Sequence, residues 1–144
     1  MTEYASMARH PDLIELRKRY DAASASPVAE GAAGLALLGA LFLAASPWIV
    51  GFSALTAITV TNLIAGVALA VIILALAASY GRLHGLTFVV PAIGIWTIVA
   101  PWAIVGAMNV TRTIYSNCIA GGALVLLGLV MLALGFLRAR RPAV

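Results

Sequence analysis

Three long intervals of the chain contain no aspartate, glutamate, lysine, arginine or histidine. They span residues 31–81, 85–111 and 113–137. Charge-free intervals of this length are unusual in soluble domains, in which charged residues average about a quarter of the chain. Only 10% of the 144 residues are charged and 63% are hydrophobic, so the chain is predicted to be an all-α integral membrane protein.

The charge-free intervals divide into four apolar runs. A helix of about 20 residues crosses a hydrocarbon core of about 30 Å, so the first interval is long enough for two helices. It breaks in GFSALTAITVT, and the second pair breaks in GAMNVTRTIYS. Four transmembrane helices are therefore predicted, at about Val28–Val50, Ile58–Ser79, Leu86–Ile104 and Tyr115–Leu137.

Lysine and arginine are unevenly distributed over the connections between these helices. Eight of the nine lie in the N-terminal segment, the middle turn SYGRLHG and the C-terminal tail, and Arg112 lies alone on the other side. Positively charged loops tend to stay in the cytoplasm. Both termini of a multi-pass protein of the cytoplasmic membrane are therefore predicted to be cytoplasmic.

Two Pro-Trp pairs, Pro47-Trp48 and Pro101-Trp102, lie near the ends of the first and third predicted helices. Each proline frees the carbonyl four residues earlier, so each helix is expected to kink or end there. The tryptophans suit the headgroup level of a membrane. A bend with an interfacial anchor is the favoured interpretation, and a ligand or quinone contact at the paired tryptophans is the alternative.

The two bends differ in the residue before proline. Ser46 precedes the first pair and is expected to donate to the carbonyl of Phe42 or Leu43. Ala100 precedes the second pair, where Thr97 or a neighbouring helix would have to satisfy the freed carbonyl.

A second motif follows each Pro-Trp pair. The sequence Asn62 to Gly66 reads NLIAG and begins fifteen residues after the first proline, and Asn117 to Gly121 reads NCIAG and begins sixteen after the second. Two motifs in the same order at nearly the same spacing indicate a duplicated helical hairpin. Because each copy begins on the cytoplasmic side, the hairpins are predicted to be parallel repeats.

A duplicated helix pair with Ser-Pro-Trp closing its first helix resembles the SPW-repeat family of small bacterial integral membrane proteins. The resemblance covers about residues 30–140 and implies fold and a bacterial membrane location. The leader HPDLIELRKRYD is similar to that of actinobacterial members. The predicted division is a cytoplasmic leader over 1–27, hairpins over 28–82 and 83–138, and a basic tail over 139–144.

The two asparagines are the most informative polar residues of the predicted helices. Asn62 and Asn117 could cap a helix terminus or bond to the Pro-Trp bend of their own repeat. They could also face each other across the axis that relates the repeats and form a small polar site.

Small residues recur at helical spacing and predict close helix packing. These rows serve the bundle interior or a contact with an oligomer or partner, for which the first helix is the candidate. Their members are Ala32, Ala36, Ala40 and Ala44 in the first helix and Gly121, Gly128 and Gly135 in the fourth.

The leader is predicted to form a short amphipathic helix with Leu13, Leu16 and Tyr20 on one face. Glu15 lies four residues before Arg19 and can pair with it. Such a helix can lie on anionic lipid or dock on a partner protein.

The sequence carries no pattern typical of an enzyme. Cys118 has no second cysteine for exchange, and His10 and His84 stand apart from other metal ligands. Glu30 in the first helical turn is expected to interact with the helix dipole, with a coupling carboxylate as the alternative. No catalytic residue, cofactor, metal or nucleic-acid partner is therefore expected.

The sequence favours a non-enzymatic membrane protein that works as a structural or accessory subunit through helix contacts and its leader. Its expected partners are the lipid bilayer, a second copy of the chain or a membrane complex. A small oligomeric transporter or channel for a neutral or lipid-like solute is the alternative.

Overall fold

The computed structural model describes residues 10–24, 27–78, 84–105 and 110–140 and shows only helices among them. The elements are α2 (Pro11–Ser24), α3 (Pro27–Val50), α4 (Thr56–Ala78), η1 (His84–Leu86), α5 (Val89–Ala100), η2 (Pro101–Val105) and α6 (Thr111–Ala139). All four predicted transmembrane helices are present with bounds within a few residues of the predicted ones, the third being formed by α5 and η2 together, and the all-α prediction is confirmed.

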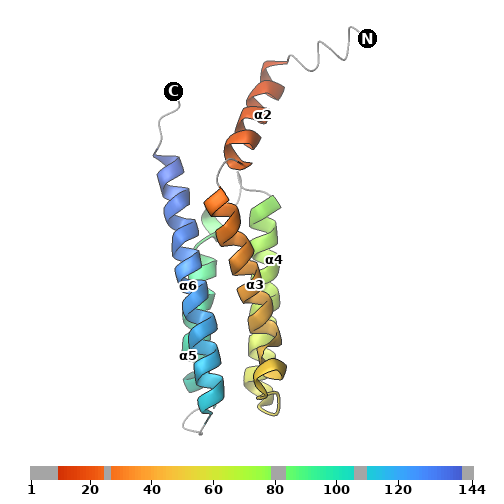
Figure 1. The fold of residues 1–144 in the computed structure, drawn as a ribbon, viewed down its shortest axis with the longest axis vertical. Helices are drawn as coiled ribbons and strands as arrows, with labels where there is room; N and C mark the ends of the chain where they lie inside the picture. Colours follow the sequence, from red (N-terminus) through yellow and green to blue (C-terminus); the bar gives the residue numbers. More distant parts are fainter. Residues whose placement is uncertain (1–9, 25–26, 79–83, 106–109, 141–144) are drawn as a thin grey trace, which may run out of the picture.

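The four helices α3 to α6 lie side by side as a bundle (Figure 1). α3 packs against α4, and α5 packs against α6, so each repeat forms one helical hairpin. α3 and α5 run in the same direction, as expected of parallel repeats. α3 also packs against α6, which joins the two hairpins. α3 and η2 end at the same end of the bundle, which we call the Pro-Trp end.

Three of the helices are long and apolar enough to cross a membrane: Pro27–Val50, Thr56–Ala78 and Thr111–Leu137. The third crossing is a shorter apolar helix, Val89–Val105, formed by α5 and η2 together. At a rise of about 1.5 Å per residue it extends about 26 Å, close to the lower limit for a crossing. The chain is therefore a multi-pass membrane protein whose third helix is its shortest crossing.

Helix α3 does not end at its proline but continues three residues beyond Pro47. It closes at Gly51, whose φ of 85° is easily adopted only by glycine. The Phe52 amide donates to the carbonyl of Pro47 at 2.9 Å, which is the six-to-one bond of a Schellman motif. A glycine cap, rather than the proline, therefore sets the end of this helix.

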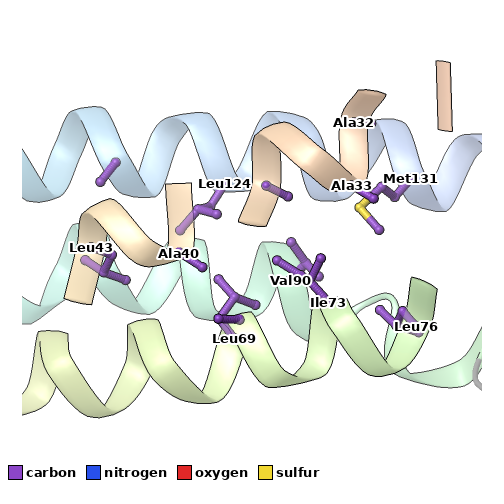
Figure 2. Packing of buried hydrophobic residues seen from close by; sticks show 13 residues of the cluster. Ala32, Ala33, Ala40, Leu43, Leu69, Ile73, Leu76, Val90, Leu124 and Met131 are labelled. Atoms are coloured by element: carbon purple, nitrogen blue, oxygen red, sulfur yellow. The ribbon is translucent and has the colours of Figure 1, made fainter. Parts of the chain in front are cut away.

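Buried apolar side chains fill the middle of the bundle (Figure 2). Leu69 and Ile73 of α4 lie against Val90 of α5, and Leu124 of α6 closes the cluster from the other side. Each of these four side chains is at most 2% exposed. Alanines of α3 complete the cluster and let the neighbouring helices approach closely. The interior is therefore apolar along most of its length.

The predicted leader helix is present as α2, beside the end of the bundle from which α3 begins (Figure 1). The expected ion pair forms, with Arg19 Nη2 2.9 Å from Glu15 Oε1 on the exposed surface. Leu13 and Leu16 are 47% and 54% exposed. The rest of the described chain therefore leaves this apolar pair uncovered. The Tyr20 side chain lies outside the described residues.

Candidate functional site

The first Pro-Trp bend satisfies its freed carbonyl with a side chain. Pro47 has no N–H for the carbonyl of Leu43, and Ser46 Oγ donates to that carbonyl at 2.8 Å. Of the two acceptors expected for Ser46, the structure therefore selects Leu43. Ser46 is fully buried, whereas Trp48 is 57% exposed on the outside of the bundle.

The second Pro-Trp bend has no such side-chain bond, and its backbone changes helix type instead. The α-helix stops at Ala100, and residues Pro101–Val105 form a π-helix, whose wider turn is common where the regular ladder is interrupted. The Thr97 hydroxyl donates to the carbonyl of Ile93 at 2.8 Å. The expectation that Thr97 would cover the carbonyl freed by the proline is therefore wrong. Trp102 is exposed like its counterpart.

The asparagines of the two repeats bond to each other in the interior of the bundle. Asn62 Nδ2 donates to Asn117 Oδ1 at 2.9 Å, and Asn117 Nδ2 donates to Asn62 Oδ1 at 3.3 Å. The two residues are only 1% and 0% exposed. Of the three interpretations, helix capping is wrong, because both side chains lie well inside α4 and α6. The bond to the Pro-Trp bend of its own repeat forms for Asn62, and the two asparagines also pair with each other. The paired amides link the repeats directly.

The amide pair extends to the first bend but not to the second. Asn62 Nδ2 also donates to Ser46 Oγ at 3.3 Å, so α3, α4 and α6 share one chain of hydrogen bonds. Ala100 stands where the second repeat would need the matching hydroxyl. The polar cluster of Ser46, Asn62 and Asn117 is therefore asymmetric, although the fold around it repeats.

The glycines that follow the asparagines mark equivalent helix crossings. A Cβ placed on Gly66 would lie 2.5 Å from the Ala44 nitrogen and 2.6 Å from the Ala40 oxygen. A Cβ placed on Gly121 would lie 2.6 Å from the Gly94 oxygen. Ala40 and Gly94 each precede the proline of their repeat by seven residues. Each hairpin therefore crosses at the same point, where no side chain fits.

The rows of small residues face inward. The alanine row of α3 is buried within the chain, which makes the alternative of a partner contact through that row wrong. Gly128 lies against Pro91 of α5, and Gly135 is half-buried. The buried row consists of Ala32, Ala36, Ala40 and Ala44.

The polar cluster contains amides and a hydroxyl but no ionisable group. Its chemistry is therefore hydrogen bonding, which orients helices and holds no proton for transfer. Glu30 lies exposed in the first turn of α3, and Cys118 is a half-buried free thiol. No group of three metal-ligating side chains occurs within the described ranges, and the His84 side chain lies outside them.

Sequence reasoning missed two hollows at the Pro-Trp end. One groove of about 320 Å³ is lined partly by Arg112 and Ser116, and a second of about 470 Å³ lies beside it and also includes Arg112. The signal in the sequence was the spacing of Arg112 and Ser116, which places both on one face of a helix.

Both Pro-Trp pairs and both asparagines lie within a single family match. The model of the SPW repeat domain matches residues 30–131. No curated protein and no solved structure gives a significant match. The matched region covers all four helices of the bundle apart from the first turn of α3 and the last turns of α6. The chain therefore belongs to the SPW repeat domain family.

Proposed function

We propose that this protein is a non-enzymatic structural or accessory subunit of the bacterial cytoplasmic membrane, with both termini in the cytoplasm. The observation that carries the proposal is the bridge between Asn62 and Asn117. A buried pair of neutral amides fixes how two hairpins face each other and offers no group that accepts or releases a proton. A bundle fixed in this way is suited to a structural role within a membrane complex.

The character of the interior supports the same role. Pathways for ions and protons generally need ionisable side chains within the membrane. Residues 31–81 and 113–137 contain no aspartate, glutamate, lysine, arginine or histidine. The interior space between the helices is occupied by leucine, isoleucine and alanine side chains. These features favour a packed scaffold over a charged conduit.

Contact with a partner would use the surface that the bundle leaves uncovered. α2 presents Leu13 and Leu16 to its surroundings, next to a basic segment that includes Lys18 and Arg19. Apolar side chains beside cations suit either a membrane surface or an acidic groove on another subunit. In the proposed role, α2 is the element that docks on a partner in the same membrane.

The test is affinity purification of the tagged full-length protein from its source membrane in native nanodiscs, followed by mass spectrometry of the intact complex. We expect a stoichiometric second polypeptide that is lost from the Leu13→Ser/Leu16→Ser variant. The control is Arg140→Gln, an exposed position outside α2 that leaves the proposed docking surface intact, and it should keep the second polypeptide. A homo-oligomer carrying bound small molecules would contradict the proposal and favour a small transporter or channel for a neutral or lipid-like solute.

Orientation has its own test in the Cys118→Ser background. Single cysteines replace Ser53, in the connection after α3, and Arg140, after α6, because both positions are exposed. A membrane-impermeant maleimide added to intact cells should label the first and spare the second. The reverse pattern would place the termini outside.

A further inference from the structure

The smaller groove at the Pro-Trp end lies between α3 and α6 on the outside of the bundle. It has a volume of about 320 Å³. Several of its walls face the surroundings, with Phe42 38%, Tyr115 66% and Ile119 70% exposed. The lining residues are Phe42, Val50, Arg112, Tyr115, Ser116 and Ile119. Because this surface belongs to membrane-spanning helices, hydrocarbon chains of lipid are what surround it.

Ser116 differs from three other hydroxyls of the membrane helices. Ser46, Thr61 and Thr97 each donate to a backbone carbonyl of the preceding turn at 2.8 to 2.9 Å. Ser116 Oγ is buried and has no hydrogen-bond partner among the residues that the structure describes, and the residue is only 6% exposed. A buried hydroxyl without a partner is costly in apolar surroundings. Ser116 lines the groove with its hydroxyl turned away from the open surface, so the side chain has to rotate for the hydroxyl to pair with an acceptor in the groove.

Arg112 brings an unmatched positive charge to the same groove. Every acidic residue of the chain lies at or before position 30. Asp12 and Glu15 lie on α2 and Glu30 lies in the first turn of α3, at the opposite end of the bundle. Arg112 lies in the first turn of α6, where the helix dipole also favours an anion. None of the described acidic residues therefore pairs with Arg112, and its charge is open to an anion from outside these helices.

Polarity changes along α6 in the order found in a phospholipid. Arg112, Ser116 and Ile119 follow one another at spacings of four and three residues, which keeps them on one face. Ser116 lies about 6 Å and Ile119 about 10 Å deeper than Arg112 along the helix. A phospholipid presents a phosphate, then an ester carbonyl, then an acyl chain over a similar progression into the membrane.

We propose that this groove is a binding site for one membrane phospholipid. The guanidinium of Arg112 donates to the phosphate oxygens, and Ser116 Oγ donates to an ester carbonyl. The acyl chain lies along Phe42 and Ile119. The site uses no residue of the buried polar cluster and stands independently of the accessory role proposed above.

The test is a lipid titration of the delipidated full-length protein in detergent, read by native mass spectrometry. The probes are phosphatidylglycerol, phosphatidylcholine, diacylglycerol and inorganic phosphate. We expect one bound copy of either phospholipid and at least tenfold weaker binding of diacylglycerol, which has esters but no phosphate. Arg112→Gln should weaken phospholipid binding about tenfold, because a charge-assisted pair is lost.

Matched variants separate a site from general attraction. Arg112→Lys keeps the charge and should retain most of the binding, and Ser116→Ala should weaken it about threefold. Arg140→Gln removes an exposed arginine at the opposite end and should change nothing. Equal losses at Arg112 and Arg140, or equal affinity for diacylglycerol and phospholipid, would overturn the proposal. Displacement of lipid by millimolar inorganic phosphate would overturn it in favour of a free-anion site.

Discussion

The two Pro-Trp bends solve the same problem in different ways. In the first, the hydroxyl of Ser46 takes over the carbonyl of Leu43, and α3 stays regular to its glycine cap. In the second, Ala100 has no hydroxyl, and the helix widens into a π-helix from Pro101 to Val105. The two equivalent bends therefore differ both in this hydroxyl and in the type of helix that follows the proline.

The difference reaches the centre of the bundle. Asn62 divides its two N–H groups between Asn117 and Ser46, whereas Asn117 donates to Asn62 alone. The first repeat thus contributes two polar residues to the network, Ser46 and Asn62, and the second contributes only Asn117. The repeated hairpins give a symmetric fold, and the presence of a serine in only one copy gives the two hairpins unequal shares of the polar network.

The largest effect is expected where the repeats are most alike, at the glycine crossings. Gly66→Ala should lower the free energy of unfolding by about 1–3 kcal/mol, since the new methyl group meets backbone atoms of α3. Gly121→Ala should cost a similar amount, because its new methyl group would lie 2.6 Å from the backbone oxygen of Gly94. Reversible unfolding by SDS titration, followed by circular dichroism, measures both.

The control for the crossings is Gly122→Ala. No atom lies within 4 Å of the added methyl group, so this variant should be neutral or gain up to about 1 kcal/mol from helix propensity. If Gly66→Ala and Gly122→Ala unfold alike, the close crossing does not limit the fold.

Substitutions of the asparagine pair should give the next largest loss of stability, and the loss should be unequal at the two positions. Asn62→Ala should cost about 1–2 kcal/mol, because it leaves the buried Asn117 amide without a partner. Asn117→Ala should cost less, since Asn62 keeps its bond to Ser46. The double variant should cost less than the sum of the two, as contacting residues do in a double-mutant cycle. Additive losses, or a larger loss at Asn117, would contradict the network.

The third largest loss of stability is expected at the glycine cap that ends α3. Gly51→Ala should cost about 1 kcal/mol, because an L side chain is strained at a φ of 85°. Gly34→Ala is the control within the same helix, since it has a helical φ and open space around it. The same unfolding titration compares the two. Equal stability of these variants would show that the Schellman motif contributes nothing to the end of α3.

Much of the fold follows from where charge is absent. The gaps between charged residues locate the helices, and the repeated Pro-Trp and asparagine motifs predict two parallel hairpins. The ends of the helices are less predictable, because capping depends on backbone angles such as that of Gly51. The π-helix after Ala100 was not predicted, because a short apolar sequence is compatible with either an α-helix or a π-helix.

The polar contacts were harder to predict than the helices. Asn62 and Asn117 are 55 residues apart, and only the packing of α4 against its neighbours decides whether they meet or cap. The alanine row of α3 gave no indication of which helix it faces. Ser116 passed unnoticed because a lone serine in a membrane helix usually bonds to its own backbone. Whether such a hydroxyl has a partner depends on three-dimensional contacts.

The smallest effect concerns the one residue that distinguishes the two bends. Ser46→Ala makes the first bend chemically like the second and should cost about 0.5–1 kcal/mol, because the Leu43 carbonyl and one Asn62 N–H each lose a partner. Thr61→Ala is the matched control, since the Thr61 hydroxyl bonds only to the carbonyl of Ala57 in the same helix. Its loss should be smaller, because such local bonds do little for the fold.

Hydrogen exchange shows whether that serine also preserves the regular helix. In Ser46→Ala, amides between Pro47 and Phe52 should exchange faster, while those of η2 keep their rate. The reverse substitution, Ala100→Ser, offers Asn117 the hydroxyl that its repeat lacks and should slow exchange in η2. Unchanged exchange in both variants would mean that the π-helix arises from the packing of α5 against α6. Ala100 would then be compatible with the second bend because the π-helix forms without a hydroxyl at that position.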